Sequence, residues 1–219
     1  MYQPHRALIG EQLWIQMRAL APDHLRPARS VLLRQGDPAT HVILLESGST
    51  LVTLSGSDGE RTLLAVRGPG ELLGELAVLD EKPRSATVIA AESCRVHLIP
   101  ASDFLLFVEE HGLLAPLLRH AITRVRESEA VRLEFATADV PLRLAGALGR
   151  LVRAGSQTSG ELIVRLTQAE LSQMIGASRN AVGSAIKPWR ESGWLETEAG
   201  GGLVIHDIQA IEQDARHAT

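Results

Sequence analysis

The chain of 219 residues is long enough for two ordinary domains of about 100 residues each. Hydrophobic residues make up 45% of it, which excludes disorder as its main state. The net charge of −4 argues against non-specific coating of nucleic acid but allows a local basic patch. No apolar run approaches the ~20 residues of a membrane span, and residues 1–20 lack the apolar core of a signal peptide. We therefore expect a globular, cytoplasmic protein without a membrane partner.

Cysteine usage limits the chemistry further. Cys94 is the only cysteine, which excludes an internal disulfide, a cysteine-rich zinc site and a four-thiolate iron–sulfur cluster. A single free thiol fits a reducing compartment. The eight histidines are scattered along the chain, and we predict no metal site.

Residues 31–99 alternate short apolar runs with turn residues. The runs are Leu32–Leu33, Val42–Leu45, Thr50–Leu54, Thr62–Val66 and Ala86–Ala90. Glycine-containing turns separate them, and Asp58-Gly59 is a hairpin-turn signal. Short strands with regular glycine punctuation predict an antiparallel roll, sandwich or barrel.

A helical period begins after Pro100, first in a short helix over Phe104–Val108. A long helix is then predicted from about Leu113, with the alternating four–three spacing of a coiled-coil seam. Its seam residues are Leu114, Leu118, Ala121, Val125, Ser128, Arg132 and Phe135. Charged residues fill the other faces, namely Arg119, Arg124, Arg126, Glu127 and Glu134. Packing on its own domain is the alternative, but a long helix between two domains favours a homodimer. The polar seam members indicate register control or a ligand nearby.

Asp139-Val140-Pro141 predicts a domain boundary. Asp139 can cap the next helix, whereas Pro141 fits only the first turn of that helix. The pattern beyond it predicts a helix over residues 142–154, a polar loop over 155–160 and a strand over 162–166.

Thr167-Gln168-Ala169-Glu170 is a capping box that opens another helix, which ends at Gly176. Ser178 can cap a second helix over residues 179–190, so the segment has a helix-turn-helix pattern. A hairpin across Gly200-Gly201-Gly202 predicts a wing. The alternative is an αα-hairpin with no DNA role. Candidate DNA-binding residues are Thr167, Gln168, Ser178, Arg179, Asn180, Gly183, Ser184 and Lys187.

A candidate anion site lies in the first half of the chain, at Gly74-Glu75-Leu76-Ala77 and Arg84-Ser85-Ala86. A glycine turn that leads into a helix, an arginine and a hydroxyl all suit a phosphate. A carboxylate beside an anion fits only if it accepts from a hydroxyl, such as a ribose 2′-OH. Together these groups describe a 3′,5′-cyclic nucleotide. A structural salt bridge between Glu75 and Arg84 is the alternative.

These motifs, in this order, resemble the bacterial transcription regulators that include the cyclic AMP receptor protein and the fumarate and nitrate reductase regulator. Beyond the motifs above, the resemblance includes Arg34-Gln35-Gly36-Asp37 and Glu46-Ser47-Gly48. It implies an α+β fold. An N-terminal antiparallel β-roll of the cyclic-nucleotide-binding jelly-roll type would cover residues 1–112. A dimerisation helix would cover 113–138 and a winged helix-turn-helix 139–219.

The resemblance also implies roles for the ligand residues. Arg84 and Ser85 would hold the cyclic phosphate, and Glu75 would accept the ribose hydroxyl. Gly74, Leu76, Ala77 and Ala86 complete the predicted cassette. Ser128 and Glu129 would contact the base. Ser128 favours cyclic AMP, but Glu129 replaces a residue that is usually neutral, so cyclic GMP stays open.

For the second domain the resemblance implies that Arg179 contacts a guanine. Asn180 and Ser184 depart from the best-known regulator, so the preferred site should differ, and Pro188 is expected to bend the helix or end it early. No catalytic constellation is visible, so we expect no enzyme. The expected partners are double-stranded DNA, a second copy of the chain and, for an activator, RNA polymerase. The alternatives are a nucleotide-binding module that acts on a protein partner, and a DNA-binding regulator that has lost or changed its ligand.

Overall fold

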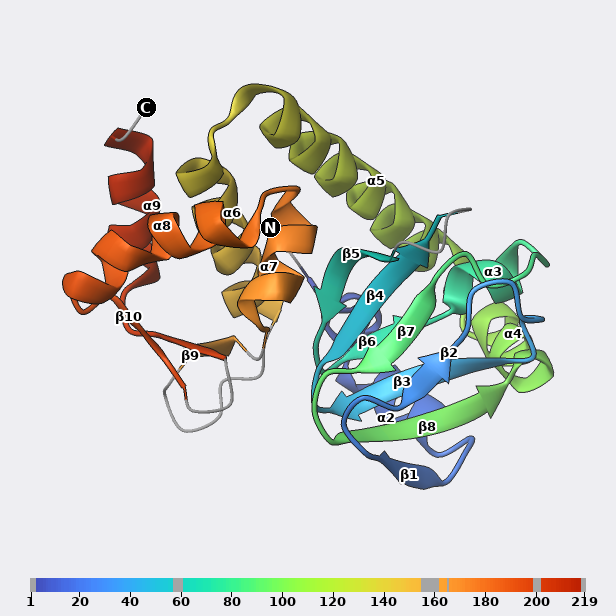
Figure 1. The fold of residues 1–219 in the computed structure, drawn as a ribbon. Helices are drawn as coiled ribbons and strands as arrows, with labels where there is room; N and C mark the ends of the chain where they lie inside the picture. Colours follow the sequence, from blue (N-terminus) through green and yellow to red (C-terminus); the bar gives the residue numbers. More distant parts are fainter. Residues whose placement is uncertain (1–2, 57–60, 155–161, 165, 199–201, 218–219) are drawn as a thin grey trace. The chain divides into compact units, whose positions relative to one another are not determined.

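The computed structural model describes the chain except for residues 1–2, 57–60, 155–161, 165, 199–201 and 218–219 (Figure 1). It divides into two compact units, residues 1–127 and 128–219. The predicted turn at Asp58-Gly59, the loop at 155–160 and most of the glycine turn of the wing lie outside the described residues. No helix among the residues described is both long and apolar enough to cross a membrane.

Among the described residues of the first unit, the strands form two antiparallel sheets of four strands each, which confirms the predicted roll. One sheet has the order β1 (Asp23–Arg26), β8 (Cys94–Pro100), β3 (His41–Ser47), β6 (Glu71–Leu73). The other has the order β2 (Val31–Leu33), β7 (Thr87–Ala90), β4 (Thr50–Ser55), β5 (Arg61–Arg67). Each of the five predicted runs coincides with a strand, apart from Ala86, which precedes β7; β1, β6 and β8 were not predicted.

Strand β3 has a continuously apolar sequence because both of its faces are buried. Val42 and Leu44 belong to a core cluster shared with helices, whereas Ile43 and Leu45 belong to a second cluster between the two sheets. All four side chains are at most 1% exposed. Because both faces of the strand are buried, the usual apolar–polar alternation is lost.

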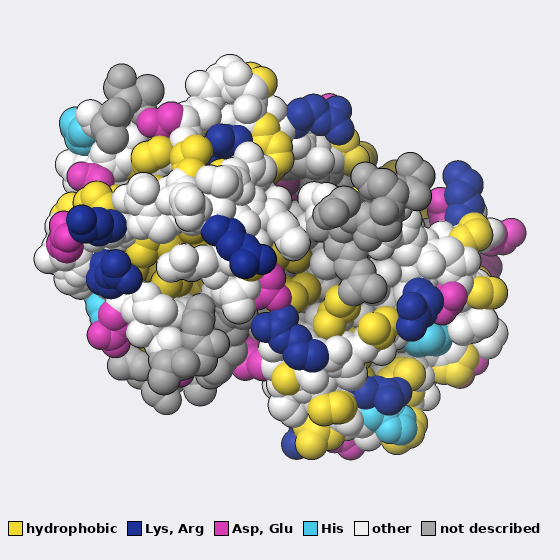
Figure 2. Space-filling model, viewed as in Figure 1, with side chains coloured by type: hydrophobic (Ala, Val, Ile, Leu, Met, Phe, Trp, Pro, Cys, Tyr) yellow, Lys and Arg dark blue, Asp and Glu magenta, His cyan; other side chains and the backbone are white. Residues whose placement is uncertain are grey.

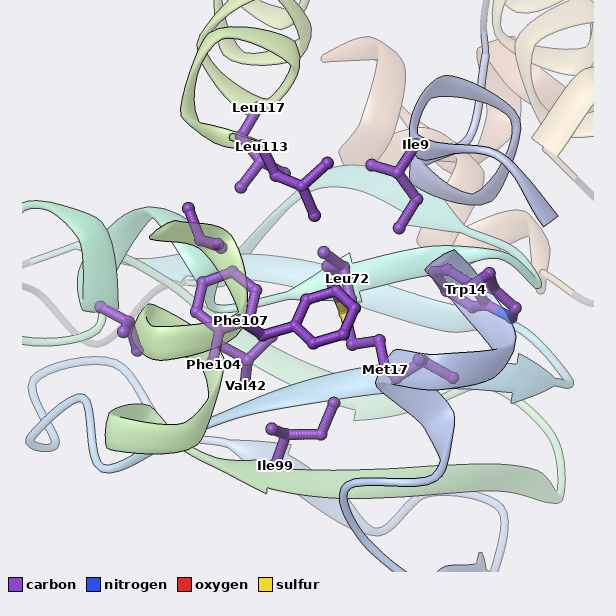
Figure 3. Packing of buried hydrophobic residues seen from close by; sticks show 13 residues of the cluster. Ile9, Trp14, Met17, Val42, Leu72, Ile99, Phe104, Phe107, Leu113 and Leu117 are labelled. Carbon is purple, nitrogen blue, oxygen red and sulfur yellow. The ribbon is translucent and has the colours of Figure 1, made fainter. Parts of the chain in front are cut away.

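Helices cover one face of the first sheet. They are α1 (His5–Ile9), α2 (Glu11–Arg18), α3 (Glu75–Leu79), α4 (Ala101–Glu110) and the start of α5 (Leu114–Thr137). Figure 3 shows their side chains packed together, with Trp14 and Met17 from α2, Phe104 and Phe107 from α4, and Leu117 from α5. This cluster fixes the N-terminal part of α5 on the roll, so α5 presents one face to its own unit.

Cys94 gives a first testable prediction. Its side chain is fully buried, and burial raises the pKa of the thiol to about 11. The thiolate is the reactive form, so a disulfide reagent should label the native protein very slowly at pH 8, and faster as the pH approaches 11. Stopped-flow labelling with and without denaturant measures this. Labelling of native protein as fast as that of the unfolded chain would contradict it.

The second unit has the predicted winged helix-turn-helix fold. Its helices are α6 (Val140–Ala154), α7 (Gln168–Ile175), α8 (Arg179–Glu191) and α9 (Ile208–His217). An antiparallel sheet has the order β10 (Leu195–Thr197), β11 (Leu203–Ile205), β9 (Leu162–Val164). At the start of α6, the Leu142 N–H donates to Asp139 Oδ1 at 3.0 Å, and Pro141 lies in the first turn as expected.

Local sequence fixes the turn between α7 and α8. The Thr167 hydroxyl accepts from the Glu170 N–H at 3.2 Å, and the Glu170 carboxylate accepts from the Thr167 N–H at 2.8 Å. Gly176 ends α7 with φ +61°, a left-handed conformation that costs glycine little. Ser178 then caps α8 by accepting from the Ala181 N–H at 3.1 Å. Pro188 does not end α8 early, because the helix continues to Glu191 around the buried Trp189. The alternative, a bend at Pro188, stays a prediction.

Candidate functional site

All seven residues of the predicted cassette line one pocket in the first unit, with a cavity volume of about 140 Å³. They lie at the N-terminus of α3 (Gly74, Glu75, Leu76, Ala77) and just before β7 (Arg84, Ser85, Ala86). The pocket also includes residues that the sequence did not point to, namely Leu33, Val52, Arg67, Leu72, Leu73, Val88 and Arg124. The structure thus brings the two halves of the cassette together over an apolar floor from both sheets.

Arg84 is held deep in this pocket at 4% exposure. Its backbone is fixed by two bonds to the Gly36-Asp37 turn: its carbonyl accepts from the Gly36 N–H and its N–H donates to the Asp37 carbonyl, both at 2.9 Å. Its guanidinium donates to the Gly74 carbonyl at 2.7 Å and to the His41 carbonyl. Burial lowers the pKa of Arg84, although an arginine stays charged at neutral pH. Among the described residues, the hydrogen bonds of this buried cation go to neutral carbonyls.

Glu75 is buried beside this cation, but the structural salt bridge considered above is not present. Within the part of the chain that the structure describes, Glu75 pairs with His5, whose Nε2 lies 3.7 Å from Glu75 Oε1. Its negative charge nevertheless favours the charged form of Arg84. A carboxylate that is not neutralised by Arg84 can accept from a ligand hydroxyl.

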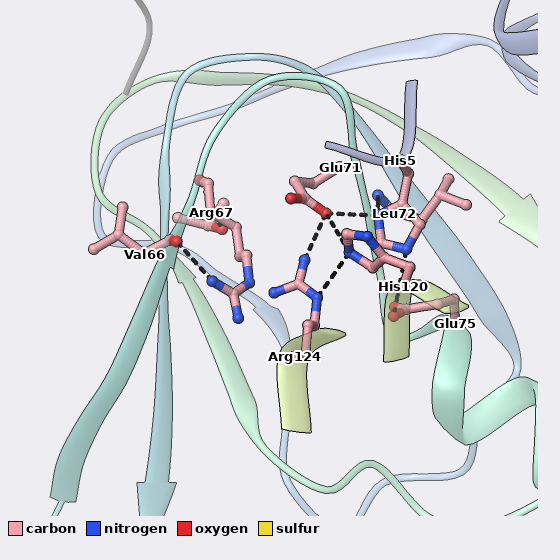
Figure 4. A network of polar contacts seen from close by, with 9 residues as sticks. His5, Val66, Arg67, Glu71, Leu72, Glu75, His120 and Arg124 are labelled. Carbon is pink, nitrogen blue, oxygen red and sulfur yellow. Dashed lines mark hydrogen bonds and ion pairs between the residues drawn. The ribbon is translucent and has the colours of Figure 1, made fainter. Parts of the chain in front are cut away.

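Arg124 differs most from its expected place. The seam pattern placed it among charged residues on the outer faces of the long helix, but it lines the pocket and its Nη2 donates to Glu71 Oε2 at 2.7 Å. Its Nε donates to His120 Nε2 at 2.9 Å (Figure 4). Arg124 and Glu71 are 53 residues apart, so sequence spacing carried no sign of the pair.

Ser128 and Glu129, the predicted base contacts, do not line this pocket. They lie further along α5 and belong to the second compact unit. Both side chains are exposed. Their role in ligand recognition stays a prediction.

The predicted seam of α5 is largely exposed. Leu114, Leu118 and Val125 are 57–60% exposed, and Phe135 is 43% exposed. Ser128 and Arg132 are exposed and Ala121 is half-buried. Leu117 and His120, one step around the helix, are buried against the roll. The helix therefore has one face on its own unit and one apolar face open to solvent.

Helix α8 has a similar division into two faces. Val182, Ala185, Ile186 and Trp189 are buried, whereas Arg179, Asn180, Ser184 and Lys187 are exposed and Gly183 is half-buried. Figure 2 shows Lys and Arg side chains over the region where Figure 1 places α8. Thr167 and Gln168, at the start of α7, are half-buried, and Ser178 is exposed. The exposed face of α8 is polar and suits a DNA groove.

Comparisons with known proteins match both units. Residues 25–111 match a model of the cyclic nucleotide-binding domain, and residues 142–213 match a model of the Crp-like helix-turn-helix domain. The chain is 30% identical over 192 residues to the cyclic AMP receptor protein of Thermus thermophilus, covering 87% of each chain. It is 28% identical over 194 residues to a CRP-like cAMP-activated global transcriptional regulator of Mycobacterium tuberculosis, covering 87% of this chain and 86% of the relative.

A solved structure has the same fold. It is the c-di-GMP responsive global regulator CLP of Xanthomonas campestris, with a TM-score of 0.70 at 20% identity over 90% of this chain and all of the other. The order of the two domains, the residues of the cassette and the descriptions of the relatives all indicate the same family. The chain belongs to the CRP/FNR family of transcription regulators, with a cyclic nucleotide-binding domain followed by a DNA-binding helix-turn-helix.

Proposed function

We propose that this protein is a homodimer that binds cyclic AMP in the pocket of its first unit and, in that state, binds a roughly palindromic DNA site through α8. The observation that supports this most is the assembly of all seven cassette residues, with a buried arginine and a carboxylate, around one pocket. An arginine can bind two phosphate oxygens, and Glu75 can accept from the ribose hydroxyl.

The choice of cyclic AMP rests on the relatives and on Ser128. Two relatives are described as a cyclic AMP receptor protein and as a cAMP-activated regulator. Glu129 accepts only, so it can receive one hydrogen bond from adenine N6 or two from the N1 and N2 groups of guanine. Cyclic GMP is therefore the main competitor. Cyclic di-GMP is a third test ligand, since a regulator of the same fold is described as responsive to it.

Ligand binding has to change this pocket. Its volume of about 140 Å³ is below the ~300 Å³ at the lower end for small-molecule sites, and two backbone carbonyls hold the Arg84 guanidinium. A cyclic phosphate competes with these carbonyls for the same donors. The ligand shifts the equilibrium between a DNA-binding and a non-binding state of the protein only as far as its affinities for these two states differ. A change from 1:99 to 99:1 needs about 5.5 kcal/mol.

The DNA arrangement follows from symmetry. A two-fold dimer presents two copies of α8, and helix-turn-helix dimers place them about 34 Å apart, one turn of DNA. The exposed Arg179 and Asn180 at the start of α8 would then contact base edges. In an activator, RNA polymerase would be the further partner.

The deciding experiment combines calorimetric titration of the full chain with electrophoretic mobility shifts. Cyclic AMP, cyclic GMP and cyclic di-GMP are titrated separately. The protein, alone and with each nucleotide, is then used to select its preferred sites from a random DNA library. We expect micromolar cyclic AMP binding and tighter DNA binding in its presence. DNA binding that no nucleotide changes would indicate a regulator with a lost or different ligand. Nucleotide binding without DNA binding would indicate a module that acts on a protein partner.

A prediction for α8 follows. Replacing Arg179 with alanine should relax the preference for one guanine in each half-site and cost about 1–3 kcal/mol per half-site. Nucleotide affinity should not change, because Arg179 lies outside the pocket. Competition mobility shifts with single-base variants of the selected site measure this. Arg216→Ala, an exposed arginine on α9, is the matched control. Equal weakening on every sequence would assign Arg179 to a phosphate instead.

A further inference from the structure

Beneath the pocket, two histidines and a glutamate meet in the interior of the first unit. His5 comes from α1, Glu71 from β6 and His120 from α5. One potential ligand atom from each residue lies within 4.8 Å of the others (Figure 4). Their side chains are only 1%, 0% and 7% exposed. The proposed nucleotide function uses none of the three.

The hydrogen bonds of His5 do not satisfy the ring. Its Nδ1 accepts from the Leu72 N–H at 3.2 Å and also lies 2.5 Å from Glu71 Oε2. One nitrogen cannot accept from an amide and donate to a carboxylate at the same time. His5 Nε2 is buried, has no hydrogen-bond partner among the described residues and faces Glu75 Oε1 at 3.7 Å. A histidine nitrogen buried in this way needs an explanation, such as a bound water or an ion.

We propose that His5, Glu71 and His120 form a binding site for a divalent transition-metal ion of the Zn²⁺ class, with Glu75 next to it as a further carboxylate. Two imidazoles and a carboxylate are a donor set that such ions prefer. Tetrahedral Zn²⁺ with bonds of about 2.0–2.1 Å places ligand atoms about 3.3 Å apart. His120 Nε2 lies 3.8 Å from Glu71 Oε2, close to that spacing. A metal bond through His5 Nδ1 needs Glu71 Oε2, which lies 2.5 Å from that nitrogen, to move away by less than one bond length, and it displaces the Leu72 N–H from Nδ1.

The cluster already binds one positively charged group, the guanidinium of Arg124. The Arg124 guanidinium donates to Glu71 Oε2 at 2.7 Å and to His120 Nε2 at 2.9 Å, which are two of the proposed ligand atoms. Because the Arg124 Nε–H donates to His120 Nε2, this ring nitrogen is an acceptor and carries a lone pair. Metal and Arg124 therefore exclude each other: the ion takes the acceptors, and the guanidinium has to leave them.

Because Arg124 and the metal compete, substitutions of the histidines and of Arg124 should change the metal affinity in opposite directions. The full chain, stripped with a chelator and dialysed, is titrated with Co²⁺ and followed by its visible absorption, and Zn²⁺ affinity is then measured against a chromogenic chelator. We expect one ion per chain. His5→Gln and His120→Gln should each weaken binding at least tenfold. Arg124→Gln, which removes a competing cation, should strengthen metal binding. His24→Gln, an exposed histidine on β1, is the matched control and should change nothing.

Thermal unfolding of each variant, with and without Zn²⁺, provides a second readout. Zn²⁺ should raise the melting temperature of the wild type and more so of Arg124→Gln, since a ligand stabilises the state that it binds. Binding that His5→Gln and His120→Gln leave unchanged would mean an adventitious surface site and would overturn the proposal. So would the absence of binding in both the wild type and Arg124→Gln. None of these measurements uses nucleotide or DNA, so their outcome is independent of the proposed function.

Discussion

Replacing Arg84 with leucine should weaken the binding of cyclic AMP and of cyclic GMP by a factor of roughly 30 to several thousand. Arg84 is the one cation of the cassette and is 4% exposed, so a phosphate bound there would lose its buried counter-charge. Removing one partner of a buried, hydrogen-bonded charge pair costs about 2–5 kcal/mol. Isothermal titration calorimetry with both nucleotides measures the loss. The same variant should bind DNA no better with nucleotide than without it.

Controls separate this effect from a loss of folding. Arg84 also donates to the carbonyls of Gly74 and His41, so leucine removes structural hydrogen bonds. Arg84→Lys keeps the charge but loses the planar two-pronged donor, and should keep part of the affinity. Arg95→Leu removes an exposed arginine of β8 outside the pocket and should leave binding unchanged. Full nucleotide affinity in a folded Arg84→Leu protein would show that the cassette is not the phosphate-binding site.

Sequence patterning predicted those parts of the molecule that are specified locally. The cassette residues are close together in the chain, although Arg84 is also held by the distant Gly36-Asp37 turn and by His41. The capping box at Thr167 and the serine cap of α8 depend on contacts over three residues. Strand β3 was recognised because burial of both its faces produces a continuous apolar run.

What the sequence missed depends on distant partners. Strand β1 is polar and mostly exposed, and it forms because it pairs with β8 about 70 residues later. Helices α1 and α2 follow Pro4 and Gly10 without a side-chain cap, so they carry no start signal. Arg124 looked like an ordinary surface charge because Glu71, its partner, lies on another element. His5 and Glu71 are 66 residues apart, which hides their cluster from any spacing rule.

A double substitution of Leu118 and Val125 by lysine should convert the protein from dimers to monomers. Both side chains are almost 60% exposed on the apolar face of α5, so lysine at these positions should hardly change the free energy of unfolding of the monomer. In a coiled coil the same positions would be buried against the partner, where two lysines would be desolvated close to two others. Analytical ultracentrifugation across a concentration series measures the change.

DNA binding supplies the second readout for this variant. A dimer gains affinity for a palindrome because the second half-site binds intramolecularly, so monomers should bind it more weakly by a factor of about 10²–10⁴. Affinity for an isolated half-site should stay the same. Leu25→Lys with Leu106→Lys adds the same charge at exposed leucines of β1 and α4, and this control should remain dimeric. If the Leu118 and Val125 variant remained dimeric with full affinity for the palindrome, the dimer would use another surface, and the exposed seam of α5 would need a different partner.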